Sequence, residues 1–183
     1  MRRLLLLCWL VALLFPPPAG GQTPEATPEP GMRGTGPCDG LKTYQGFYLV
    51  AYSSTSYEHS EALELLRSAS ESDTSAEDFA SSLTPEDMLL LRDYYLALAA
   101  VMDELSPPDF ARDWHRLQQE SLQLTGEIYG DAATLGLSAA GAMHSADASV
   151  LIEALNTYFG RSSPCPAFLT WAREQSVLGS VLT

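Results

Sequence analysis

Four side chains of the types that bind transition metals stand out in this sequence: His59, His115, His144 and Asp147. His144 and Asp147 form the only histidine and carboxylate pair with a spacing of three residues. Helical bundles that hold metals commonly use a Glu-x-x-His motif, and the chain does not contain one. A histidine metal site is therefore an alternative, and surface or boundary positions are the simpler interpretation. We predict no cofactor.

Aromatic residues offer a second kind of site, an apolar pocket between helices. The candidates for its lining are Tyr48, Tyr95, Trp114 and Tyr158. Their helical spacing favours a filled core, and a pocket for a lipid or another hydrophobic ligand is the alternative. The sequence leaves both interpretations open.

Motifs for catalysis are absent from the sequence. The chain has no glycine-rich phosphate loop, no dinucleotide-binding glycine pattern, no nucleophile elbow and no zincin motif. No segment places a serine, a histidine and an acid in a readable arrangement. We therefore predict that the protein is not an enzyme.

The cysteines predict one disulfide. Cys8 lies within an apolar N-terminal run, which leaves Cys38 and Cys165 in the rest of the chain. An isolated pair in an oxidising compartment most simply forms a bridge. Two unpaired thiols are the alternative, and two cysteines alone are a poor zinc site because zinc binds four ligands.

Apolar spacing predicts an all-α fold in which four long helices form an up-and-down bundle, followed by a short C-terminal helix. The first helix opens near Asp39, with a kink or frayed turn at 53–56, where hydroxyl side chains compete for backbone hydrogen bonds. Its apolar stripe contains Leu41, Tyr44, Phe47, Tyr48 and Ala51. Short connections would return the chain to its starting end, where Cys38 and Cys165 meet.

The remaining helix boundaries follow from capping residues. Thr84 and Pro85 predict the start of the second long helix, and 106–108 ends it. The third helix spans 106–129 and ends at Gly130, and Ser145 and Gly160 bound the fourth. From 132 to 148 small residues predict either a packed crossing or a loose loop. The last helix starts at Cys165 and Pro166.

The N-terminal residues indicate export. Residues 1–21 combine two arginines, a short apolar run and small residues before position 22, as secretory signals do. Residues 22–37 form a Pro/Thr/Glu-rich tether, and 38–183 form the helical domain. We expect no stable membrane span after signal cleavage, and a retained anchor is the alternative. The protein is then extracytoplasmic, either secreted or associated with the cell envelope.

The charge of the chain argues against nucleic-acid partners. Ten Lys and Arg oppose 23 Asp and Glu, for a net charge of −13. Removal of Arg2 and Arg3 with the signal leaves 8 against 23, or −15. Such a surface repels phosphate backbones and anionic lipid headgroups.

The segment 105–108, followed by Trp114, His115 and Leu117, resembles a loose group of uncharacterised exported helical proteins from GC-rich bacteria. A cysteine before the first helix and another before the last add to the likeness. The resemblance implies a bacterial extracytoplasmic domain and no particular activity. We hypothesise a noncatalytic exported bundle that binds a partner protein or envelope component. The alternatives are a carrier of a hydrophobic small molecule and a metal-binding bundle.

Overall fold

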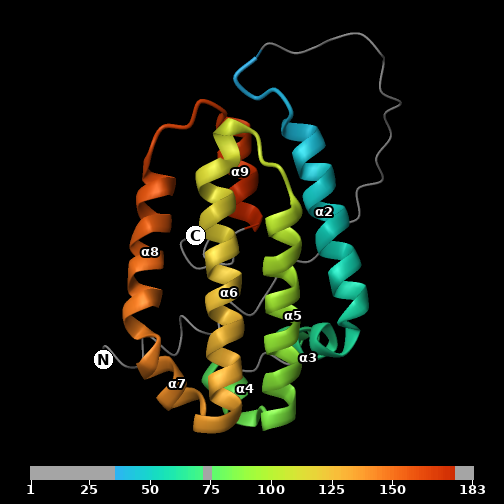
Figure 1. Cartoon of the computed structure of the whole chain (residues 1–183), viewed down its shortest axis with the longest axis vertical. Helices are drawn as coiled ribbons and strands as arrows, with labels where there is room; N and C mark the ends of the chain where they lie inside the picture. The colour runs from blue at the N-terminus through green and yellow to red at the C-terminus, as the bar shows by residue number, and fades with distance from the viewer. Residues whose placement is uncertain (1–35, 72–75, 176–183) are drawn as a thin grey trace.

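The computed structural model describes residues 36–71 and 76–175, and these residues form helices and connecting turns (Figure 1). The all-α prediction is confirmed for these ranges. The predicted signal at 1–21 and all but the last two residues of the predicted tether lie outside them. The helices are α2 (Leu41–Glu58), α3 (Ser60–Glu71), α4 (Ala76–Ser82), α5 (Pro85–Glu104), η1 (Asp109–Ala111), α6 (Arg112–Leu135), α7 (Leu137–Met143), α8 (Ser145–Gly160) and α9 (Pro166–Gln175).

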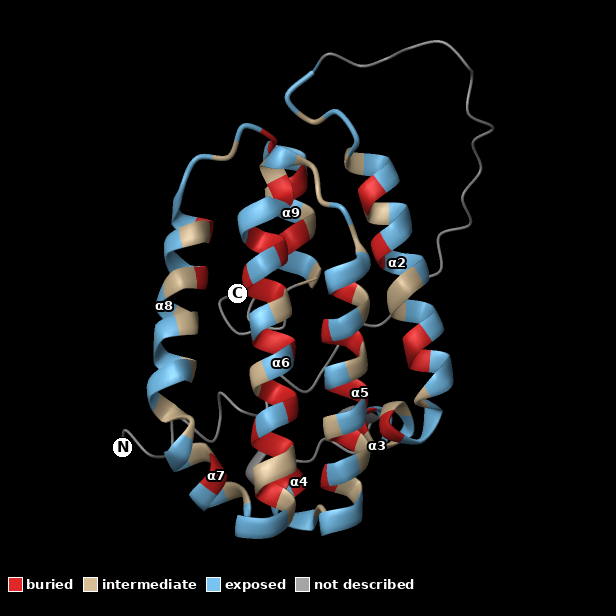
Figure 2. Ribbon diagram, in the orientation of Figure 1, coloured by how far each residue is buried: buried red, intermediate tan, exposed pale blue. Residues whose placement is uncertain are grey.

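The α5–α6 pair is the centre of the fold. α6 packs along α5, α2 packs on α5, and α8 packs on α6. In Figure 1 α2 and α8 are therefore the outer members of the four long helices. Buried residues follow the sides of these helices that face their neighbours (Figure 2). The largest fully buried side chains include Trp114, Tyr94, Tyr129 and Phe168.

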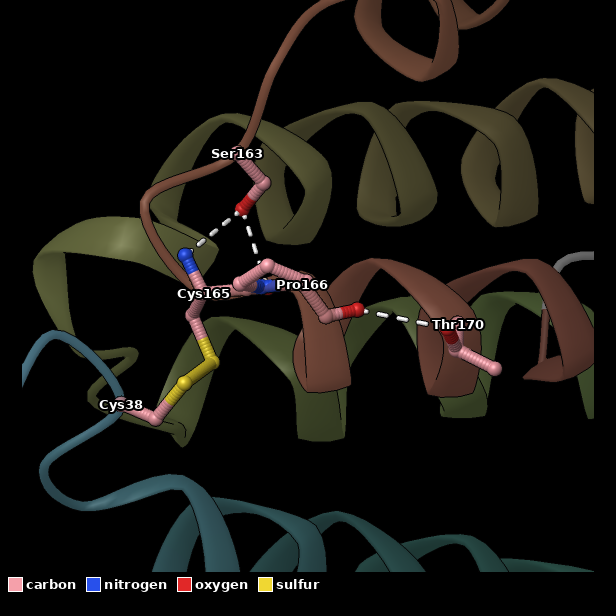
Figure 3. Close-up of a disulfide and its surroundings, with 5 residues drawn as sticks. All are labelled: Cys38, Ser163, Cys165, Pro166 and Thr170. Carbon is pink, nitrogen blue, oxygen red and sulfur yellow. Dashed lines mark hydrogen bonds between the residues drawn. A yellow bond between two sulfur atoms is a disulfide. The ribbon is translucent and has the colours of Figure 1, made fainter.

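The predicted disulfide is present. Cys38 and Cys165 are bonded, with their Cα atoms 5.0 Å apart and 127 residues apart in sequence (Figure 3). Closing so long a loop stabilises the fold by about 5 kcal/mol in the chain-entropy model. Beside the bridge, the backbone N–H of Cys165 donates to Ser163 Oγ at 3.1 Å. The disulfide therefore joins the segment that precedes α2 to the residue that precedes α9.

The start of α5 confirms the capping prediction. The backbone N–H of Asp87 donates to Thr84 Oγ1 at 3.2 Å, and the backbone N–H of Thr84 donates to Asp87 Oδ2 at 2.9 Å. Pro85 occupies the first turn, where no intrahelical N–H bond is lost. The helix ends at Glu104, just before the predicted stop.

The predicted kink at 53–56 is wrong, because α2 continues through it to Glu58. Thr55 Oγ1 donates to the carbonyl oxygen of Ala51 at 3.0 Å, within the helix. Ser56 Oγ lies 3.2 Å from the hydroxyl oxygen of Tyr94 on α5. These hydroxyls are satisfied without opening the backbone, and the break comes at His59.

The predicted bounds of the third helix are also wrong. Residues 109–111 form η1, and α6 extends through Gly130 to Leu135. A methyl group at Gly130 would lie 3.0 Å from Arg92 Cδ on α5, so this glycine permits close packing. The helix ends instead at Gly136, whose φ of 81° favours glycine.

Short helices fill the connections between the long ones. The small-residue stretch 132–148, which the sequence left open, contains the end of α6, the whole of α7 and the start of α8. Ala140 of α7 is fully buried. α4 places the buried side chain of Phe79 in the core. Among the described helices, none has both the length and the apolar character that crossing a bilayer requires.

Candidate functional site

Three of the candidate residues, Tyr48, Trp114 and His115, lie together in the packed interior. Tyr48 and Trp114 have ring centroids 5.7 Å apart, and Trp171 of α9 lies 5.1 Å from Tyr48 and 5.4 Å from Trp114. Phe168 packs edge-on against Trp114 at 5.6 Å. We call these four residues, with Tyr44, the aromatic cluster. It joins α2, α6 and α9.

His115 is the polar centre of this cluster. Its Nε2 lies 2.8 Å from the carbonyl oxygen of Met102, which can only accept a hydrogen bond. Nε2 therefore carries the proton, and Nδ1 accepts from the Tyr44 hydroxyl at 2.7 Å. Burial lowers the pKa of His115, against smaller opposite effects of the Met102 carbonyl and Asp103. The ring is a neutral structural group with both nitrogens occupied.

The other candidate metal ligands have separate surroundings. His144 Nε2 lies 2.7 Å from Asp131 Oδ2, and the ring of His59 packs near Tyr94. The candidate Asp147 is exposed in the first turn of α8. Across 36–71 and 76–175 no three His, Cys, Asp or Glu side chains gather in an arrangement that could hold a metal ion.

The four candidate pocket residues fall in three places. Tyr48 and Trp114 belong to the aromatic cluster, whereas Tyr95 stacks on Tyr129 at 5.9 Å between α5 and α6. Tyr158 lines an open surface cavity of about 340 Å³ between α6 and α8, together with Leu117 and Val150. The structure therefore packs three of the candidates into the core and does not gather the four around one cavity.

The outer face of α2 is the more unusual surface. Thr43, Phe47, Val50, Ser54 and Tyr57 recur at spacings of four and three residues on one side of the helix. All five are exposed, and the exposed fractions are 61% for Phe47, 69% for Val50 and 84% for Tyr57. Figure 2 shows exposed residues on the side of α2 that faces away from α5. We call these five residues, with Gly46 and Ser53 beside them, the outer face of α2.

This face has no charged residue in a strongly acidic protein. Lys42 and Glu58, near the two ends, are the only charged residues of α2, while the chain as a whole has a net charge of −13. Exposed apolar patches without charge are characteristic of interaction surfaces.

Gly46 supports the same interpretation. A glycine inside a helix costs about 0.5–1 kcal/mol relative to alanine. A methyl group at Gly46 would meet no neighbouring atom within 4 Å in the part of the chain that the structure describes. Packing within the described chain therefore does not require this glycine, in contrast to Gly126, where a methyl group would lie 2.7 Å from Leu96 Cγ.

The opposite outer helix provides a comparison. α8 exposes Val150 to the same extent as Val50, 69%. Unlike α2, however, α8 carries Asp147 and Glu153 within its length, and both are exposed. The two valines are thus matched in exposure but differ in surroundings.

The outer face was not predicted from the sequence, because Phe47 was assigned to the packing stripe of the first helix. The helix has two stripes, an inner one with Tyr44, Tyr48 and Thr55 buried and an outer one that starts at Thr43. The absence of charged residues between Lys42 and Glu58 was the sequence feature that could have indicated this exposed apolar face.

Comparisons with models of protein families, with curated proteins and with solved structures find no significant match to this chain. The function is therefore argued from the chain's own residues.

Proposed function

We propose that this chain is a noncatalytic exported protein that binds a partner protein through the outer face of α2. In this proposal the four long helices form an up-and-down bundle that presents α2 at its edge. The exposure of Phe47, Val50 and Tyr57 on one uncharged helical stripe is the observation that carries the proposal.

The chemistry of the face defines the kind of partner. An amphipathic helix would fit, because its apolar side chains can lie along a stripe of 4-3-4-3 spacing. Nucleic acid and anionic membranes are poor partners, since the net charge of −13 repels phosphate groups. Association through this face would depend on apolar burial and would weaken little in high salt.

Export is supported by the signal-like pattern of residues 1–21 and by the disulfide, which is typical of oxidising compartments. We do not favour the carrier alternative, because three of its four candidate residues pack in the core.

Site-specific photo-crosslinking in the source organism tests this function. A photo-reactive residue at position 50 is expected to join the protein to one defined polypeptide, identified by mass spectrometry. The same residue at position 150 is the matched control and should give no such product.

Competition identifies the surface involved. Excess wild-type protein should suppress a product with a different polypeptide, whereas excess Val50→Glu protein should not. In a product with a second copy of this chain, excess wild-type protein takes part in the crosslink and does not suppress it. Equal labelling from positions 50 and 150, or the absence of a product from both, would overturn the proposed function.

A further inference from the structure

We propose that the partner of the outer face of α2 is a second copy of this chain, in an antiparallel α2–α2 pair centred on Val50. This inference rests on the proposed function and names the partner. Three features of the face support it: the order of large and small residues, the glycine within it, and the position of its flanking charges.

The face is complementary to itself when one copy is reversed. Antiparallel pairing about Val50 brings Phe47 of one copy to the level of Ser53 of the other, one residue from Ser54. The same pairing brings Tyr57 to the level of Thr43, and Val50 to Val50. Each large aromatic residue thus meets a small hydroxyl residue, which is the alternation that helix packing requires.

Gly46 allows the two helices to approach closely. It lies beside Val50 and Phe47 on the exposed side, and no atom of the described residues lies within 4 Å of a methyl group placed there. In the reversed copy Ser54 lies at the level of Gly46, with Ser53 next to it, so small residues face each other on both sides of the centre. Contacts among the described residues of one chain leave this glycine unexplained, and a close helix pair explains it.

For two copies of this chain, charge favours pairing through this face and in this direction. Two molecules of net charge −13 repel each other, and the repulsion is least where neither carries an acid. Reversal also brings the end of α2 with Lys42 to the level of the end with Glu58. A parallel pair would place Lys42 beside Lys42 and Phe47 beside Phe47.

The size of the face predicts a weak dimer. The stripe runs over 15 residues, from Thr43 to Tyr57, or about 21 Å for a rise of 1.5 Å per residue. One helix pair of this length buries less than the roughly 800 Å² per partner of a standard interface. We therefore expect association at about tens to hundreds of micromolar protein, strengthened by salt because salt screens the repulsion between acidic molecules.

Sedimentation velocity of the purified, disulfide-bonded protein tests the dimer. The wild-type protein should shift toward the dimer as its concentration rises, and Val50→Glu should weaken association at least about tenfold because it places two carboxylates together at the centre. Val150→Glu is the matched control and should associate like wild type. A wild-type protein that stays monomeric to millimolar concentration overturns the inference, as does equal weakening by the two substitutions.

Cross-linking tests the direction of the pair. A short bismaleimide should link Val50→Cys molecules to each other and should link Phe47→Cys to Ser54→Cys in a mixture. Self-linking of Phe47→Cys as efficient as the mixed product indicates a parallel pair and contradicts the proposal.

The two proposals fail differently. A monomeric protein whose position 50 is photo-crosslinked to a different polypeptide rejects the second copy and retains the proposed function. A monomeric protein without a specific crosslink at position 50 rejects both.

Discussion

Along α2 two adjacent aromatic residues lie on opposite sides of the helix. Tyr48 is 3% exposed and packs in the aromatic cluster, whereas Phe47 is 61% exposed. The inner face is held by rings from α6 and α9 and by the Tyr44–His115 hydrogen bond. The outer face has apolar side chains and no such contacts among the described residues, which separates the part of α2 that stabilises the fold from the part available for recognition.

Truncation of the two neighbours should separate the faces most clearly. Tyr48→Ala is expected to lower the free energy of unfolding by about 3–5 kcal/mol, because it removes a buried ring and leaves a cavity. Phe47→Ala should change it by less than about 0.5–1 kcal/mol. Urea unfolding followed by circular dichroism measures both values in dilute protein. Similar losses for the two variants would show that Phe47 is part of the fold.

Two helix glycines should respond in opposite directions. Gly126→Ala is expected to lower the free energy of unfolding by about 1–3 kcal/mol, since its methyl group would meet Leu96 and the Arg92 carbonyl oxygen across the α5–α6 contact. Gly46→Ala should raise it by about 0.5–1 kcal/mol and weaken self-association. The pair of measurements uses unfolding in dilute protein and sedimentation in concentrated protein. A Gly46→Ala protein that is both less stable and fully associating would contradict the account of the outer face.

Acidification should affect the inner face alone. Because the pKa of His115 is lowered in the fold, the unfolded chain binds more protons below the ordinary pKa of about 6.5, and stability from this group is lost as pH falls through that value. His115→Phe should remove this part of the pH dependence. The outer face contains no histidine or carboxylate, so association should not follow the same titration. Unfolding midpoints between pH 5 and 7.5 for both proteins test this, and an unchanged slope in the variant would assign the titration elsewhere.

Local chemistry made much of the fold predictable from sequence. Thr84, Pro85 and Asp87 form the helix cap without any residue from elsewhere in the chain, so the start of α5 could be predicted from the local sequence. The disulfide followed from Cys38 and Cys165 being the two cysteines outside the apolar N-terminal run. By contrast, Gly130 lies inside α6 where a side chain would crowd Arg92 of α5, and Ser56 is satisfied by Tyr94 across a tertiary contact. Such partners are not visible in a single stretch of sequence.

The candidate site was less predictable. The aromatic residues were recognised, but helical spacing alone did not decide which side of the first helix faced α5. Tyr44 and Tyr48 lie on the inner side of α2, where their rings contact His115, Trp114 and Trp171. Phe47 belongs to the second stripe, which the packing of α2 leaves outside.

The most direct test of the account measures stability and association together for Val50→Glu and Val150→Glu. Val50→Glu should unfold in dilute solution within about 0.5 kcal/mol of wild type and still lose both concentration-dependent association and specific crosslinking, whereas Val150→Glu should retain all three properties. A large loss of folding stability in Val50→Glu, or association equal to that of Val150→Glu, would contradict the claim that the outer face of α2 serves recognition and not folding.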